Sequence, residues 1–190
     1  SQGYLDHLES LPLGPNVVPL IPHSMLRIEV MGLNGSVDRT PTGQELARME
    51  QLLDAGMSQG YAGFSTDALP FHFLANAPNK KKKIPTQYAG FRELARLVDI
   101  VRRYGRVWQA TPPKDNIIAA VRSFMLSSGR LYRRPLKTTV LAAIDLQTNR
   151  SAMHLCLLLS SILNSRMLKG MLRFQALSSS FRIWSDGAIN

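Results

Sequence analysis

The chain has 190 residues, enough for one domain with a sizeable core and too few for two ordinary domains. Hydrophobic residues make up 45% and charged residues 19%, a globular composition that excludes an intrinsically disordered protein. The formal net charge of +10 leaves polyanions open as partners. However, the basic residues are scattered apart from four lysines at 80–83 and the pair Arg133-Arg134, which argues against nucleic-acid binding.

Cysteine usage and hydropathy predict the compartment. A single cysteine, Cys156, excludes an intrachain disulfide framework and a multi-cysteine zinc site, so we expect a reducing cytoplasm. No apolar stretch approaches the ~18 residues of a membrane span, so we expect no membrane contact. The first ten residues lack the basic start and apolar core of a signal peptide. They have the pattern of an amphipathic helix, which hints at a chain cut from something larger.

Two apolar periodicities alternate along the chain. Short continuous apolar runs predict strands, whereas apolar residues three or four apart predict helices. Thr42 with Glu45 has the signature of a capping box, Gly105 can close a helix, and Asp115 can cap the next one. In chain order we predict a strand at Asn16–Ile21, a helix at Thr42–Met57, a strand at Tyr61–Ser65, a helix at Tyr88–Tyr104, a strand at Arg106–Ala110, a helix at Asn116–Leu126, a strand at Thr138–Asp145, a helix at Arg150–Leu172 and a last strand or strand pair at Phe174–Trp184.

This alternation predicts an α/β fold in which helices cover a parallel sheet. Five strands and the helices between them fit an open doubly wound sheet or an arc of a (β/α)8 barrel. No G-x-G-x-x-G or G-x-x-x-x-G-K-[ST] follows any predicted strand, so a nucleotide-binding function has no phosphate loop to support it.

Polar residues follow each predicted strand, at the end where parallel α/β folds gather their chemistry. A pocket of such residues could orient a small polar substrate, and His23, Asp67 and Asp145 could ligate a metal or move a proton. Each also has a structural explanation, because His23 can bond a loop carbonyl and both aspartates can cap a turn or helix. The strand-end residues are His23-Ser24, Ser65-Thr66-Asp67, Gln109, Thr111, Asp145, Gln147, Gln175 and 178–180.

The other reactive residue types form no recognisable motif. His72, between two phenylalanines, is expected to pack or to lie at a rim, and His154 and Cys156 to be buried along a helix. H-x-H, H-E-x-x-H and G-x-S-x-G are all absent from the sequence. The residues taken alone therefore predict an α/β domain with a polar strand-end rim, and they specify no reaction.

Four segments together resemble the N-acyl-D-amino-acid deacylases (D-aminoacylases) of the amidohydrolase superfamily. They occur in the family's order and at its spacing, and the likeness runs from about residue 3 to Asn190. The segments are PHSMLRIEVMG (22–32), ELARMEQLLDAGMSQGYAGFSTD (45–67), ELARLVDIVRRYGRVWQATP (93–112) and KTTVLAAIDLQTNR (137–150).

The resemblance implies part of a (β/α)8 barrel that hydrolyses the amide of an N-acyl-D-amino acid with a water activated by zinc or another divalent metal. It also implies that the family's H-x-H strand precedes this region and that its catalytic Asp follows it. We therefore expect residues 1–190 to be a single, incomplete barrel domain of about five strands. We expect this internal fragment of a longer enzyme to be inactive in isolation.

The sequence departs from the family at two strand ends. Where the family has His-x-Arg, this chain has Ala110-Thr111-Pro112-Pro113, and where it has Ser-His, this chain has Ile144-Asp145. Asp145 is therefore the one candidate metal ligand at these positions. The residues expected to bind substrate are His23, Arg27, Ser65, Thr66, Asp67, Gln109 and Thr111, with Arg27 a partner for a substrate carboxylate.

Other functions stay open at this point. A non-catalytic α/β domain could bind a small molecule, or it could bind a polyanion through the four lysines at 80–83. We expect that lysine run to be mainly a solvated tip on a long loop, 70–87, that forms a lid or rim. A partial barrel also leaves open sheet edges, so association into a homo-oligomer is expected.

Overall fold

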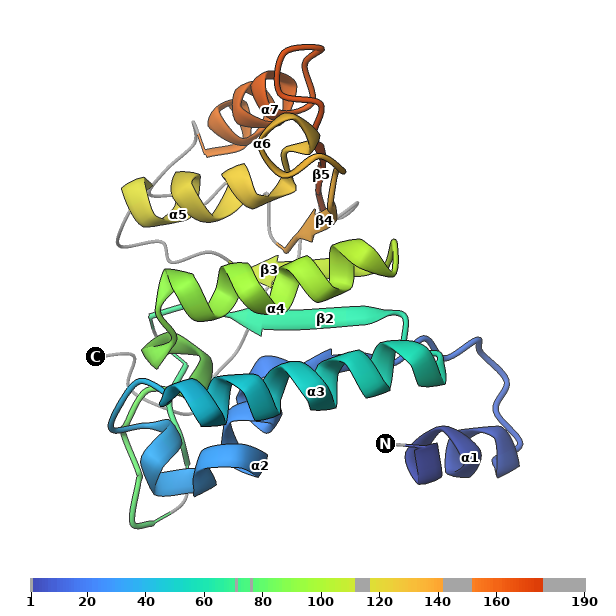
Figure 1. Ribbon diagram of the computed structural model, residues 1–190, viewed down its shortest axis with the longest axis vertical. Helices are drawn as coiled ribbons and strands as arrows, with labels where there is room; N and C mark the ends of the chain where they lie inside the picture. Colours follow the sequence, from blue (N-terminus) through green and yellow to red (C-terminus); the bar gives the residue numbers. More distant parts are fainter. Residues whose placement is uncertain (1, 71, 76, 112–116, 142–151, 176–190) are drawn as a thin grey trace, which may run out of the picture.

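The fold is built on a five-stranded parallel sheet. The computed structural model describes residues 2–70, 72–75, 77–111, 117–141 and 152–175. Each strand is hydrogen-bonded to the next one in the sequence (Figure 1). Such an unbroken order is that of an arc of a (β/α)8 barrel, whereas a doubly wound sheet reverses its order partway. The strands are β1 (Leu20–Pro22), β2 (Gly63–Asp67), β3 (Val107–Thr111), β4 (Lys137–Val140) and β5 (Met171–Phe174).

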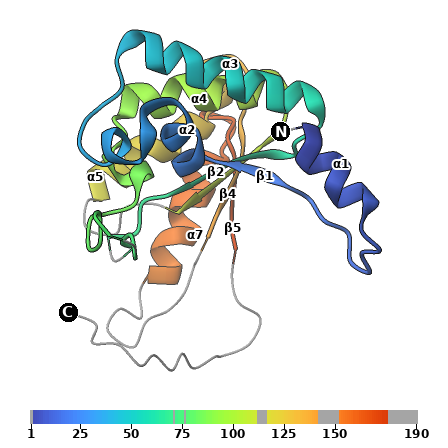
Figure 2. The same cartoon turned by 90° about the horizontal axis from the view of Figure 1, so that it is seen from below.

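The helices that follow β1 and β2 lie against one side of the sheet. Figure 2 shows α2, α3 and α4 on the same side of β1 and β2, and in Figure 1 the long helices α3 and α4 run in front of the sheet. The helices are α1 (Gln2–Ser10), α2 (His23–Ser36), α3 (Gly43–Gln59), η1 (Pro85–Tyr88), α4 (Phe91–Arg103), α5 (Ile117–Phe124), η2 (Met125–Ser127), α6 (Gly129–Tyr132) and α7 (Ala152–Leu163). The predicted α/β fold with a parallel sheet is confirmed.

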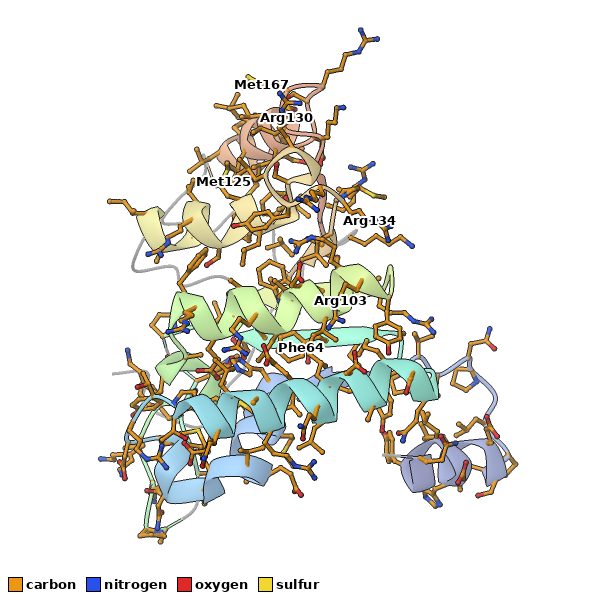
Figure 3. The ribbon with its side chains drawn as sticks, in the orientation of Figure 1. Phe64, Arg103, Met125, Arg130, Arg134 and Met167 are labelled. Carbon is orange, nitrogen blue, oxygen red and sulfur yellow. The ribbon has the colours of Figure 1, made fainter. Side chains whose placement is uncertain are left out.

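The strand register separates the sheet into two chemically different faces. Phe64, Trp108, Thr138 and Leu172 are aligned across four strands, and all four are buried on the side that the helices cover. Phe64 lies between α3 and α4 in the view of Figure 3. Because side chains alternate along a strand, the residues that follow these four belong to the opposite face. That face is only partly covered, and we call it the open face.

Local signals fix the helices that cover the sheet. The predicted capping box at the start of α3 is present: the Thr42 hydroxyl accepts from the Glu45 backbone N–H, and the Glu45 carboxylate accepts from the Thr42 N–H. Gly105 follows α4 with a φ of +62°, a left-handed conformation that suits glycine and ends the helix where the sequence predicts.

The last two predicted elements are misplaced. The helix predicted at Arg150–Leu172 ends at Leu163, and β5 occupies 171–174 instead of starting at Phe174. The Asn164 side chain stops the helix, because its Oδ1 accepts from Leu172 N and its Nδ2 donates to Leu172 O, both at 2.8 Å. The Gly170 N–H then bonds Leu163 O, which returns the chain to the sheet. Residues 176–190 lie outside the described part of the chain.

The first predicted strand is also shorter than expected. β1 begins at Leu20, and Val17 and Val18 are 46% and 66% exposed instead of forming a buried strand from Asn16. The apolar run 16–21 therefore enters the sheet only at its end. The N-terminal helix, α1, forms as predicted.

Candidate functional site

A row of polar side chains crosses the open face. Ser65, Gln109, Thr139 and Arg173 are paired in register on adjacent strands β2 to β5. The first three are half-buried and Arg173 is exposed. Strands lie ~4.8 Å apart, so the backbone row is roughly 14 Å long. We call these four residues the polar row.

The sequence predicted half of this row. Ser65 and Gln109 are candidate substrate-binding residues because the sequence predicts them near strand ends, but each is the central residue of its strand. Thr139 and Arg173 are not among the predicted candidates. The alternating pattern of the segments KTTV and MLRF would have indicated both residues. Side chains alternate along a strand, so Thr139 and Arg173 point away from the face where the adjacent Thr138 and Leu172 are buried. Arg173 was missed for a further reason: the predicted helix extended through Leu172 and displaced the strand.

Beyond the row, the carboxyl end of β2 carries a carboxylate–imidazole pair. The Asp67 carboxylate contacts the Nδ1 atom of His72, and its Oδ1 also accepts from the Leu69 N–H at 3.0 Å. Asp67 and His72 are partly exposed, with side-chain accessibilities of 33% and 42%. The sequence predicted Asp67 as a site residue and assigned His72 to packing or the rim. Their pairing brings an oriented imidazole to the mouth of the barrel arc.

The His72 backbone is held as firmly as its ring. The His72 N–H donates to Leu69 O at 3.2 Å, and its carbonyl accepts from Ile84 N at 3.3 Å and from Gln87 Nε2 at 2.9 Å. An imidazole fixed in this way has little orientational freedom to lose when it engages a substrate.

The loop after β2 folds back on itself. Leu74 N donates to Lys82 O at 2.8 Å, and Lys81 N donates to Leu74 O at 3.1 Å. Lys82 pairs with Asp38 at 2.7 Å, while Lys80, Lys81 and Lys83 are exposed. The lysine run is thus mainly a solvated tip, as the sequence predicts.

His23 and Arg27 lie in a buried network on the helix side of the sheet. His23, Arg27 and Glu93 are 1%, 0% and 3% exposed. Glu93 accepts from Arg27 Nη1 at 2.6 and 2.7 Å and contacts His23 Nε2 at 2.9 Å, while His23 Nδ1 lies 2.8 Å from the Thr86 hydroxyl. Arg27 Nη2 donates to the carbonyls of Ser36 and Arg39. These acceptors occupy Arg27, so it does not reach the open face.

Burial and pairing set the protonation states in this network. Burial lowers the pKa of His23, and the hydrogen bond and charge of Glu93 oppose this only in part. Burial alone would raise the pKa of Glu93, but the hydrogen bonds and charges of His23 and Arg27 together leave that pKa lowered. His23 is therefore neutral beside an ionised Glu93, with Nε2–H donating to the carboxylate and Nδ1 accepting from Thr86.

We expect this network to make the fold acid-sensitive. Below the ordinary His23 pKa of 6.5, the unfolded chain binds a proton that the folded protein does not, so stability falls. Below the ordinary Glu93 pKa of 4.5, the unfolded Glu93 takes up a proton before the folded one, and stability falls further. Urea unfolding at pH 7.5 and 5.5 measures the first loss. His23→Gln should reduce it, and an unchanged pH dependence in that variant would contradict the assignment.

A cavity of about 550 Å³ opens on the helix side, beside the carboxyl ends of β2 and β3. His23, Thr66 and Thr111, three of the predicted site residues, line it together with Lys83 and Arg122. Thr66 is held by Trp108, whose Nε1 donates to the Thr66 hydroxyl at 3.0 Å. The structure therefore divides the predicted site: Ser65, Asp67 and Gln109 belong to the open face, whereas Thr66 and His23 belong to the helix side.

The described residues do not fit a complete metal centre. Among them, no group of three or more His, Cys, Asp or Glu side chains is arranged to hold a metal ion. Asp67 and His72 are two such side chains, and four ligands are usual for zinc. The predicted ligand Asp145 lies outside the described residues, as does Asp115. Among the described helices, none has both the length and the apolar character of a membrane span.

The sequence was compared with family models and with curated proteins. No family model matches the chain. Uncharacterized proteins of Mycobacterium bovis and of two strains of Mycobacterium tuberculosis are 35% identical to it over 188 residues, which is 97% of this chain and 30% of each of theirs. The chain thus spans about a third of the length of the curated relatives that it matches.

Solved structures of D-aminoacylase share the fold. One, described by the role of its binuclear metal center, matches with a TM-score of 0.65 and 20% identity over 92% of this chain and 33% of its own. Another, described as defining a novel subset of amidohydrolases, matches with a TM-score of 0.63 over the same shares. The architecture that the sequence resemblance implied is confirmed: this chain has the fold of one part of a D-aminoacylase.

Proposed function

We propose that the chain is the part of an amidohydrolase-type enzyme that binds an N-acyl-D-amino acid and helps to cleave its amide bond. The observation that carries this proposal is the open face itself. On a sheet with the fold of D-aminoacylase, a polar row and an oriented Asp67–His72 pair occur together at one side of the strands. Active sites of (β/α)8 barrels lie at the carboxyl ends of the strands, where the Asp67–His72 pair stands.

The groups of this chain can serve the substrate in two ways. Ser65, Gln109 and Thr139 can exchange hydrogen bonds with the acyl carbonyl and amide N–H, which orients a small polar molecule. His72, oriented by Asp67, can hold or move a proton at Nε2 next to the amide nitrogen. Amide cleavage requires a proton on the departing amine, so a fixed imidazole at this position suits the reaction.

A divalent metal, zinc or another, is part of the proposal for the whole protein. The related D-aminoacylases are described by a binuclear metal center. In such enzymes a metal activates the attacking water. Because the described residues do not form a metal centre, we propose that its ligands come from outside them and that the 190-residue chain alone is inactive. A cytoplasmic location and association through the edges of β1 and β5 remain predictions.

The proposal is tested in the protein that carries this segment, by hydrolysis of N-acetyl-D-amino acids and their L-enantiomers. We expect turnover of the D-series, and His72→Gln should lower kcat by roughly 10²- to 10⁴-fold with little change in KM, since it removes a proton-transfer group. His7→Gln, on the exposed face of α1, is the matched control. Absence of turnover by the unsubstituted protein would refute the hydrolase assignment, and a kcat near normal in His72→Gln would refute the role of His72.

The helix-side cavity supports a second candidate, a small-molecule-binding domain without catalysis. Lys83 and Arg122 line its 550 Å³ beside Trp108 and Phe91, a mixture of basic and aromatic side chains that suits a small anion. This alternative predicts saturable ligand binding that Arg122→Gln weakens, with no hydrolysis of any N-acyl amino acid. Turnover of N-acetyl-D-amino acids would decide against it.

A further inference from the structure

Arg173 is the charged member of the polar row. It stands on β5 between Leu172, which is fully buried, and Phe174. The Phe174 ring packs edge-on against the ring of Phe124 on α5, with 5.9 Å between the ring centroids. Strand alternation therefore puts the Arg173 side chain on the face opposite to α5, which is the open face. Its register partner is Thr139 on β4.

The guanidinium of Arg173 keeps most of its hydrogen-bonding capacity. Its Nη1 donates to Leu172 O at 3.2 Å, and no ion pair among the described residues includes it. A guanidinium has five N–H donors, so a bidentate face remains for an anion. Arg27, the arginine that the sequence favours, differs in both respects: it is fully buried, and Glu93 and two carbonyls occupy its Nη1 and Nη2 groups.

Three arginines of α4 are also engaged elsewhere. Arg96 binds Glu50 through two nitrogens, Arg102 binds Asp99 and Leu126 O, and Arg103 pairs with Asp54. These three belong to α4, which covers the helix side of the sheet. Arg173 thus combines an open-face position with donors that no carboxylate of the described residues engages.

We propose that Arg173 binds the carboxylate of the substrate and so favours turnover of substrates that carry a free carboxylate. This inference rests on the proposed function, because it assigns one end of the substrate of that same site. The remaining members of the row, Ser65, Gln109 and Thr139, are uncharged and suit the amide. A charged hydrogen bond at one end and neutral groups along the row give the substrate a single orientation across the open face.

The test pairs an arginine variant with a change in the substrate. Arg173→Gln is assayed in the full-length protein with an N-acetyl-D-amino acid and with the corresponding N-acetyl-D-amino acid carboxamide, which lacks the charge. We expect kcat/KM for the acid to fall roughly 10- to 100-fold, the value of a charge-assisted hydrogen bond, while that for the carboxamide is unchanged. For the acid, kcat/KM of Arg173→Lys should lie between that of the unsubstituted protein and that of Arg173→Gln, because lysine keeps the charge and loses the bidentate geometry.

Two controls make the outcome specific. Arg166→Gln, at an exposed position between α7 and β5, should leave both substrates unaffected. Calorimetric titration with an N-acetyl-D-amino acid should show weaker binding to Arg173→Gln than to the unsubstituted protein. If Arg173→Gln lowers turnover of acid and carboxamide equally, or lowers neither, the inference is overturned while the hydrolase assignment stands. If the unsubstituted protein neither binds nor cleaves the acid, both fall.

Discussion

Glu93→Gln is expected to lower the free energy of unfolding by about 3 kcal/mol, because it removes the charge that neutralises a buried arginine. Arg27 is 0% exposed and donates to both Glu93 oxygens. The glutamine would keep the volume but offer the guanidinium one uncharged acceptor oxygen in place of the carboxylate, beside the two backbone carbonyls. In urea or thermal unfolding, a loss of this size corresponds to a Tm decrease of roughly 6–12 °C for a chain of this length.

The matched control is a carboxylate that joins α3 to α4 instead of α2 to α4. Glu50 binds Arg96 with two short hydrogen bonds, but the Glu50 and Arg96 side chains are 23% and 40% exposed. Solvent screens such a pair, so Glu50→Gln should lower stability by at most about 1 kcal/mol. Equal losses in the two variants would mean that burial adds nothing to the Arg27–Glu93 pair, contrary to our expectation.

Gly63→Ala is expected to destabilise the sheet by about 3 kcal/mol through overpacking. A Cβ at Gly63 would lie 1.9 Å from the backbone oxygen of Val107 on β3 and 3.1 Å from Leu20 Cδ2 on β1. The nearest atom belongs to a backbone that is itself paired in the sheet, so it cannot rotate away as a side chain can. The change should also weaken the polar row, because β2 and β3 carry Ser65 and Gln109 in direct register.

An alanine at Gly43 tests the same substitution without the clash. Gly43 is the first residue of α3, and a Cβ there would meet no atom within 4 Å. Gly43→Ala should change the free energy of unfolding by no more than about 0.5 kcal/mol. Circular dichroism during urea unfolding of both variants measures the difference. A Gly63→Ala protein as stable as Gly43→Ala would show that β2 and β3 are farther apart than the structure indicates.

The predicted elements that the structure confirms are those fixed by short-range signals. The helix beginning at Thr42 forms because the capping box needs only residues three apart. The helix predicted over 150–172 was too long, because a long-range contact ends it. Its apolar pattern continues, but Asn164 binds Leu172 eight residues away and ends the helix, and no local propensity records that contact.

Site residues divide in the same way. Ser65, Asp67 and Gln109 are candidates that the sequence suggests, because chemistry gathers near strand ends, and the structure places all three on the open face of β2 and β3. His72 could not be assigned to the site, since its pairing with Asp67 depends on how the following loop folds back. Arg27 is a reasonable carboxylate partner by residue type alone, and its burial against Glu93 follows only from the packing of α2 on α3 and η1, which brings it to α4.

The sequence by itself determined the alternation of strands and helices, the parallel sheet and the polar character of the strand ends. These follow from periodicity and capping, which act over a few residues. Only the tertiary structure decided which face each side chain belongs to and which distant residues meet, such as His23 and Glu93, 70 positions apart. Register and close packing settle those choices, because a one-residue shift of any strand would exchange its buried and open faces.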